Sequence, residues 1–401
     1  MGVARGTSVL KVLFPAGSSA DKCAAVIQYE EGSLVRDVLD IVAQKYGGER
    51  SDDWGLFDVN ESCGAGQWLD PESIMPKQQG PVHYQSKIRQ CIVTDIDNSL
   101  RKTVLLNETS TVAELTATIA KRFGIDDSSE FSLQKHQHLQ LVWLVPEQPL
   151  YLQVPADQVI VFRKKFFVSD SLVGVEQPSL LHVLYLEARH AIITGAHPLS
   201  FELAVQFAAM NMQITYGNYD PLVHVAGFMD VMEFLPPPYR SAAFIEEYVY
   251  REHRRLRGAD ELVVKHRFIR RCKHLPTYGA TFSLAREQYS DEGLTADILL
   301  GANCNAVLCL NRTTKEIVGR NLLVEINAVD LEGACLTLRL KGRDREFILD
   351  TVPDARLLHD LIVGYKYFQR TKAAQKTPPI LTASSFLAGA HPTPAAAADR
   401  D

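Results

Sequence analysis

The residues of this chain that could do chemistry are few and widely spaced. His136 and His138 stand two apart in the stretch KHQHLQ, a spacing that two metal ligands on one turn could use. A protein metal site needs a third or fourth ligand, and this two-histidine loop lacks one. We therefore expect a solvated turn at KHQHLQ, no metal site and no cofactor.

The seven cysteines are odd in number, scattered, and never spaced as C-x-x-C, so zinc ribbons and thioredoxin-type chemistry have no support. The sequence also lacks the motifs G-x-x-x-x-G-K-[ST], H-E-x-x-H, G-x-S-x-G and G-x-G-x-x-G. No catalytic residue is predicted, and an enzyme is the least favoured class. Without a basic-then-apolar leader or an apolar run of about 18 residues, a cytoplasmic protein with reduced thiols is expected.

Cations gather in two places, although the net charge of −6 argues against a general nucleic-acid binder. Residues 251–273 hold nine Lys or Arg against three Asp or Glu. This segment is either an ordinary solvated helical face or a surface for anionic lipid or actin. Its cations are Arg251, Arg254, Arg255, Arg257, Lys265, Arg267, Arg270, Arg271 and Lys273. The second place is RKKFFVSD, 163–170, whose three cations could extend that surface.

The elements that must position these residues follow from hydrophobic periodicity. Residues 1–86 and 87–165 each read as two strands, one amphipathic helix and further strands, the order of a ubiquitin-like β-grasp. In the second stretch Thr111 and Glu114 stand in capping-box register at the start of the helix. Two tandem β-grasp lobes are therefore predicted.

The period then changes from 2 to 3.6. Residues 166–274 carry helical stripes, with Ser200 suited to cap one helix, and predict a small helical bundle. Residues 275–372 return to strands and close with one amphipathic helix, the plan of PH and PTB domains. Residues 373–401, rich in Ala and Pro, read as a flexible tail or linker. The fold class is thus α+β and multidomain.

Several strings, spread over about 370 residues, resemble the heads of talins, which are FERM domains with an additional N-terminal ubiquitin-like lobe. They are WGLF with QWL, EFSL, RKKFFVSD, LLHVLYLEARHAIITGAHPLSF, AGFMDVMEFLP, LPTYGATFSL and TTKEIV. The resemblance implies an acyl-CoA-binding-protein-like helical lobe and a PTB-like β-sandwich with a C-terminal helix. The long basic loop that talins carry in the second lobe is essentially absent here.

The resemblance also implies a receptor-tail site in the PTB-like lobe, where an integrin β tail adds to a sheet edge and its NPxY turn enters a pocket. The matching strand is LLVEINAVD, 322–330. In animal talins an arginine and a tryptophan stand at the positions of Ala328 and Val329, so the usual hot spot is missing. The implied tail-binding residues are Glu325, Ile326, Asn327, Ala328, Val329 and Phe347. The alternative is a core strand that has no ligand.

The membrane surface departs from talins as well. Few cations flank AGF at 226–228, and the loop REQYSDEGLTAD is net acidic. The implied function is a cytoskeletal adaptor that links an integrin-like β cytoplasmic tail, and inner-leaflet phospholipids such as phosphoinositides, to F-actin. It would act at the plasma membrane, cell cortex and adhesion sites, in a protein continued by a rod. The alternative is an actin- or anionic-lipid-binding FERM module that no longer binds integrin tails.

Overall fold

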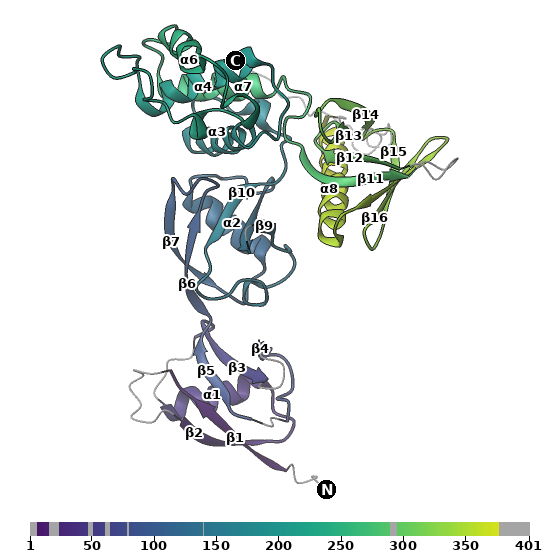
Figure 1. The fold of residues 1–401 in the computed structure, drawn as a ribbon. Helices are drawn as coiled ribbons and strands as arrows, with labels where there is room; N and C mark the ends of the chain where they lie inside the picture. The colour runs from purple at the N-terminus through teal and green to yellow at the C-terminus, as the bar shows by residue number, and fades with distance from the viewer. Residues whose placement is uncertain are drawn as a thin grey trace, which may run out of the picture. The chain divides into compact units, whose positions relative to one another are not determined.

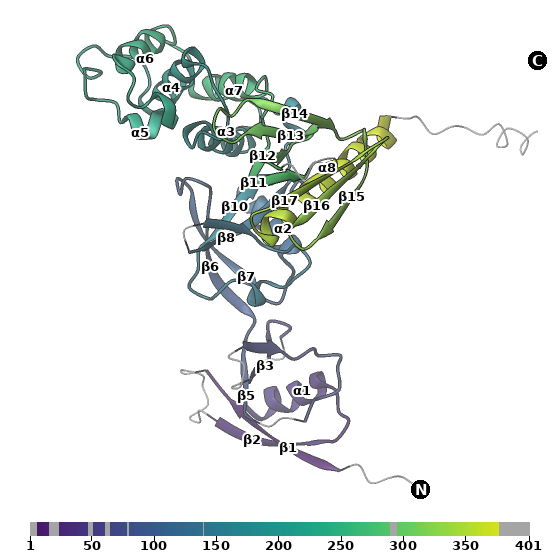
Figure 2. The same ribbon diagram turned by 45° about the vertical axis from the view of Figure 1, so that its right-hand side comes forward.

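A computed structural model describes residues 6–15, 24–46, 51–60, 65–77, 80–138, 140–288 and 295–376. The chain divides into two compact units, residues 1–278 and 279–401 (Figures 1 and 2). Parts of two predicted segments, 289–294 of the acidic loop and 377–401 of the Ala/Pro-rich tail, lie outside the described residues.

The first unit begins with a mixed five-stranded sheet in the order β2-β1-β5-β3-β4, in which β1 runs parallel to β5. Period-two alternation turns Leu10 and Val12 of β1 inward, against Val38 and Val42 of α1. Burial of both apolar faces holds helix and sheet together. The elements are β1 (Thr7–Leu13), β2 (Ala24–Glu30), α1 (Val35–Tyr46), β3 (Trp54–Asn60), β4 (Ala65–Trp68) and β5 (Val82–Ser86).

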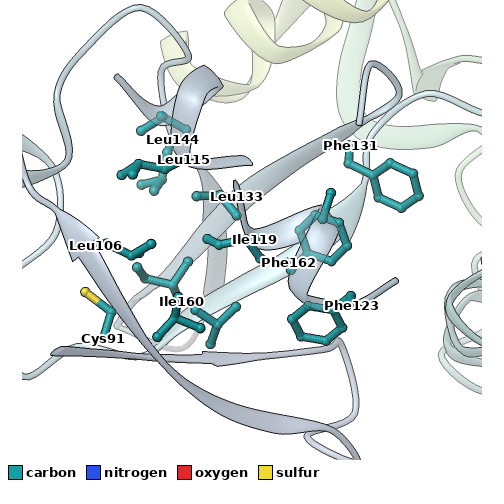
Figure 3. Packing of buried hydrophobic residues seen from close by; sticks show 14 of the residues in the cluster. Cys91, Leu106, Leu115, Ile119, Phe123, Phe131, Leu133, Leu144, Ile160 and Phe162 are labelled. Carbon is teal, nitrogen blue, oxygen red and sulfur yellow. The ribbon is translucent and has the colours of Figure 1, made fainter. Parts of the chain in front are cut away.

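The second sheet repeats this plan in the order β7-β6-β10-β8-β9. The predicted capping box is present, because Thr111 accepts a hydrogen bond from the Glu114 amide and Glu114 accepts one from the Thr111 amide. In its core Phe162 stacks on Phe123 and Phe131, with centroids 5.2 and 5.0 Å apart (Figure 3). The elements are β6 (Ile88–Thr94), β7 (Arg101–Asn107), α2 (Val112–Arg122), β8 (Phe131–Gln137), β9 (Gln140–Trp143) and β10 (Ile160–Lys164).

The helical lobe follows, and its second helix is capped as predicted, with Ser200 accepting from the Leu203 amide. Its core packs Tyr185 and Leu184 of α3 against Phe207 of α4 and Phe268 of α7. The elements are α3 (Pro178–Ile193), α4 (Phe201–Tyr216), α5 (Val231–Phe234), α6 (Ile245–Arg254) and α7 (Glu261–Cys272).

The described strands of the second unit form one seven-stranded sheet, in the order β14-β13-β12-β11-β17-β16-β15, and α8 (Val352–Lys376) packs on it. The expected strand 322–330 is interrupted: β14 ends at Leu322, and a turn closed by Glu325 N to Leu322 O at 2.9 Å precedes β15. The strands are β11 (Thr281–Gln288), β12 (Thr295–Ala302), β13 (Ala306–Asn311), β14 (Ile317–Leu322), β15 (Ile326–Glu332), β16 (Cys335–Leu340) and β17 (Asp344–Leu349).

Candidate functional site

The strand β15 lies at one end of the seven-stranded sheet. Within the described residues it pairs only with β16, so the backbone groups on its other side face no strand. The pairing shifts register between Ile326 and Ala328, which leaves Asn327 as a bulge. An unpaired edge is a template that an extended peptide can continue by main-chain hydrogen bonds.

Most of the predicted tail-binding residues lie on this edge. Asn327 and Ala328 are exposed and Val329 is half-buried, whereas Ile326 points into the core. Glu325 belongs to the preceding turn, where its carboxylate accepts a hydrogen bond from the Leu322 amide at 3.2 Å. The edge therefore offers a backbone with small side chains and lacks a large anchoring residue.

Phe347 does not lie beside this edge. It is on β17, which β16 separates from β15, and it is completely buried. The ring packs under the Arg345 guanidinium, whose carbon lies 5.2 Å from the ring centroid. Phe347 is therefore a core residue here and presents no surface to a ligand.

Two charged residues beside β15 were not singled out from the sequence. Arg339 on β16 lies opposite Ala328 and forms ion pairs with Asp330 at 2.6 Å and Asp344 at 2.5 Å. Lys366 of α8 donates a hydrogen bond to the Ile326 carbonyl. The only sequence signal for Lys366 is its place in an amphipathic helix, because nothing in the letters shows which strand that helix meets.

The cations of 251–273 fall into two groups. Arg257, Arg267 and Arg270 are exposed and form no ion pair with any described residue. Four others are exposed but already interact with a neighbouring side chain. Arg251 makes a cation–π contact with Tyr248, Arg254 and Arg271 donate hydrogen bonds to Tyr219 and Gln206, and Arg255 forms an ion pair with Glu252.

The remaining two cations of this segment face inward. Lys265 is buried, 2.5 Å from Glu261 and 2.9 Å from His182. Lys273 donates to the Asp170 carbonyl, and burial lowers its pKa more than Asp170 raises it. The predicted surface is thus smaller than the run of nine letters suggests.

The cations of RKKFFVSD do not extend that surface. Arg163 binds Glu187, Lys164 is enclosed by Glu130 and Asp170, and the Lys165 ammonium lies 5.6 Å from the centroid of Trp143. Lys164 is 3% exposed. The junction is a set of structural ion pairs between the second sheet and the helical lobe.

The histidine pair shows no metal geometry. His138 adopts a left-handed backbone, with φ of 55°, in the turn after β8. Among the described residues there is no group of three or more His, Cys, Asp or Glu that could hold a metal ion. In the same part of the chain, no helix has the length and apolar character needed to cross a bilayer.

Residues 171–282, which span α3 to α7, match the family model of the FERM central domain. Talin-B of Dictyostelium discoideum is 31% identical over 351 residues, which cover 86% of this chain and 13% of Talin-B. Human Talin-2 is 26% identical over 382 residues, 84% of this chain and 15% of Talin-2. The chain thus spans a small part of these relatives' length.

Solved structures agree on the fold. The FERM domain of Drosophila Merlin, in complex with its C-terminal domain, superposes with a TM-score of 0.60 at 19% identity, covering 71% of this chain and 98% of that one. The MyTH4-FERM domain of human Myosin 7b gives 0.59 at 13% identity, covering 71% and 61%. With its matched central lobe and its likeness to talins over most of its length, the chain belongs to the FERM family as a head of the talin type.

Proposed function

We propose that the chain is the head of a non-enzymatic cytoskeletal adaptor, and that its second unit captures the NPxY-type cytoplasmic tail of an integrin-like receptor at β15. The observation that carries this proposal is the open edge of β15, next to the long helix α8. Main-chain hydrogen bonds to an added strand do not depend on the identity of Ala328 or Val329.

Affinity at this edge should be modest. Arginine and aromatic anchors provide most of the binding energy in protein interfaces, and a missing anchor costs about 2 kcal/mol. The exposed side chains on β15 are short, so backbone pairing and contacts to α8 must supply most of the energy. A Kd in the high micromolar range, on the order of 10⁻⁴ M, is expected for an isolated peptide.

The finer lobe assignment belongs to the same proposal. Residues 1–86 and 87–165 are taken as ubiquitin-like β-grasp lobes, 166–274 as an acyl-CoA-binding-protein-like helical lobe, 275–372 as a PTB-like lobe and 373–401 as a linker. The helix α8 runs on to Lys376, so the first four positions expected in the linker are helical. The two five-stranded sheets with equivalent strand orders support the first pair. The seven strands followed by one helix support the PTB-like lobe.

A second candidate function rests on α7 and the turn that precedes it. Arg257, Arg267 and Arg270 are exposed and unpaired among the described residues, so they can meet an anionic surface without first breaking an ion pair. We propose F-actin or anionic phospholipid as the partner of this surface. Either partner would hold the protein at the cell cortex or the inner face of the plasma membrane.

Methyl NMR of the full chain tests tail capture directly. Methyl groups of Val324, Ile326, Ala328 and Val329 report on the edge, and those of Val9 and Val26, exposed in the first sheet, serve as controls. Adding an NPxY peptide should shift the first set and leave the second unchanged. If the edge methyls do not move at millimolar peptide, tail capture is wrong and the cationic helices become the leading candidate.

A further inference from the structure

The helix α8 has a defined side next to the edge strand. Its core positions are buried at helical spacing: Ala355, Leu358, Leu361, Ile362 and Tyr365. Lys366 lies at the border of this buried face, and its ammonium donates to the carbonyl of Ile326, the first residue of β15. That bond identifies the side of α8 that borders β15.

Two more residues share this side by helical spacing. Val363 precedes Lys366 by three positions and Arg370 follows it by four, and both are exposed. The Lys366 and Arg370 cations are close enough to interact: burial and the charge of Arg370 both lower the pKa of Lys366. An anion placed near both would relieve that repulsion.

The carboxylates of Asp330 on β15, Glu325 in the turn before it and Asp360 on α8 make contacts of their own. Asp330 is held by Arg339, Glu325 accepts the Leu322 amide, and His359 contacts Asp360. Arg370 forms no ion pair within the part of the chain that the structure describes. Two cations beside the open edge are therefore left without a carboxylate at hydrogen-bonding distance among the described residues.

We propose that the segment captured at β15 is acidic, with an aspartate or glutamate on its α8 side that Lys366 and Arg370 receive. The inference rests on the proposed tail capture and deepens it by naming the chemistry of the partner.

An added strand presents alternate side chains to α8, so the proposal has a period-two signature. We would titrate the full chain with labelled peptides that carry an NPxY turn behind an otherwise neutral extended segment. One Glu is moved through four successive upstream positions, each paired with a Gln peptide. Glu should tighten binding about three- to fivefold at alternate positions only, and the gain should shrink as salt rises.

Two variants test whether Arg370 is a cation that receives the Glu of the peptide. Arg370→Gln should reduce the advantage of Glu to less than about twofold, because only Lys366 of the pair remains, and leave the affinity for the Gln peptides unchanged. Arg356→Gln is the matched control, because Arg356 is exposed on the same helix, about 21 Å away along its axis. It should retain the full advantage of Glu.

Each other outcome counts against a specific claim. Equal binding of Glu and Gln peptides overturns the acidic preference and leaves tail capture standing. A gain at every position, or one that Arg370→Gln does not reduce, means general attraction and also overturns the proposal. Binding of no peptide overturns tail capture, and the acidic preference with it.

Discussion

The Arg163 guanidinium holds the Glu187 carboxylate through both of its oxygens, with Nε 2.9 Å from Oε1 and 3.2 Å from Oε2. Arg163 is on β10 and Glu187 is in α3, so this pair joins the second sheet to the helical lobe. Beside it, Lys164 lies 2.6 Å from Glu130 and 3.1 Å from Asp170. The basic junction therefore stabilises the relation of two lobes, and its charges are not available to a ligand.

Replacing Glu187 by Gln should lower the free energy of unfolding of the first unit by about 3 kcal/mol, because it leaves the mostly buried Arg163 cation without its counter-charge. Urea unfolding followed by fluorescence measures this loss. Glu72→Gln is the control, because the Arg36–Glu72 pair is largely exposed and should contribute less than about 1 kcal/mol. Equal effects of the two substitutions would contradict the structural role of Arg163.

His197 should make the helical lobe sensitive to acid. It is buried, with Nδ1 2.9 Å from the Thr277 hydroxyl, and burial lowers its pKa to about 4. In the unfolded chain the His197 imidazole takes up a proton near pH 6.5, whereas in the folded chain it stays neutral. The part of the free energy of unfolding that is present above pH 6.5 is therefore lost as the pH falls toward 4. The loss attributable to His197 is about 3 kcal/mol over that range.

The acid effect can be isolated by comparison with His197→Asn. Unfolding free energies of both proteins are measured at several values between pH 7 and 4.5, so that contributions of all other groups cancel in the difference. The free energy of unfolding of the wild type minus that of His197→Asn should fall steadily as the pH decreases. Parallel curves would show that His197 titrates normally in the folded protein.

The double substitution Ala328→Arg with Val329→Trp should strengthen tail binding about tenfold, because it adds the cation and aromatic anchor that the edge lacks. Arg339, the cross-strand neighbour of Ala328, is already neutralised by Asp330 and Asp344, so a new arginine meets little repulsion. Fluorescence anisotropy with an NPxY peptide measures the change. Val324→Trp, in the turn before β15, adds an aromatic outside the strand and should have a smaller effect.

Local signals in the sequence predicted much of the fold. The capping box at Thr111 and Glu114 and the cap at Ser200 mark two helix starts that the structure confirms. These features depend on residues within one turn of each other, so their spacing is visible in the letters. Resemblance to talins supplied the family, and the family model and the relatives support it.

The sites were harder to predict because they depend on distant residues. Lys164 looked like a surface cation, but Glu130, 34 positions earlier, folds against it. Phe347 looked like a pocket residue, yet the sheet order places β16 between it and the edge. The break between β14 and β15 was missed because LLVEIN keeps an apolar pattern through the turn at 323–325. Periodicity cannot separate such a turn from a continuous strand.

The exposed arginines of α7 give the last prediction. Charge reversal of Arg267 and Arg270 to Glu should abolish most cosedimentation of the full chain with F-actin or anionic vesicles, because each cation near an anionic lipid surface contributes about 1 kcal/mol. Wild-type binding should weaken as salt rises from low to physiological concentration.

A matched charge reversal keeps this experiment specific. Arg101 is exposed on β7 of the second sheet, outside the segment 251–273, so Arg101→Glu changes the net charge without touching α6 or α7. It should bind almost like the wild type. If it loses binding as strongly as either single reversal, Arg267→Glu or Arg270→Glu, which changes the net charge equally, the attraction comes from the overall charge, and α7 is an ordinary solvated helix.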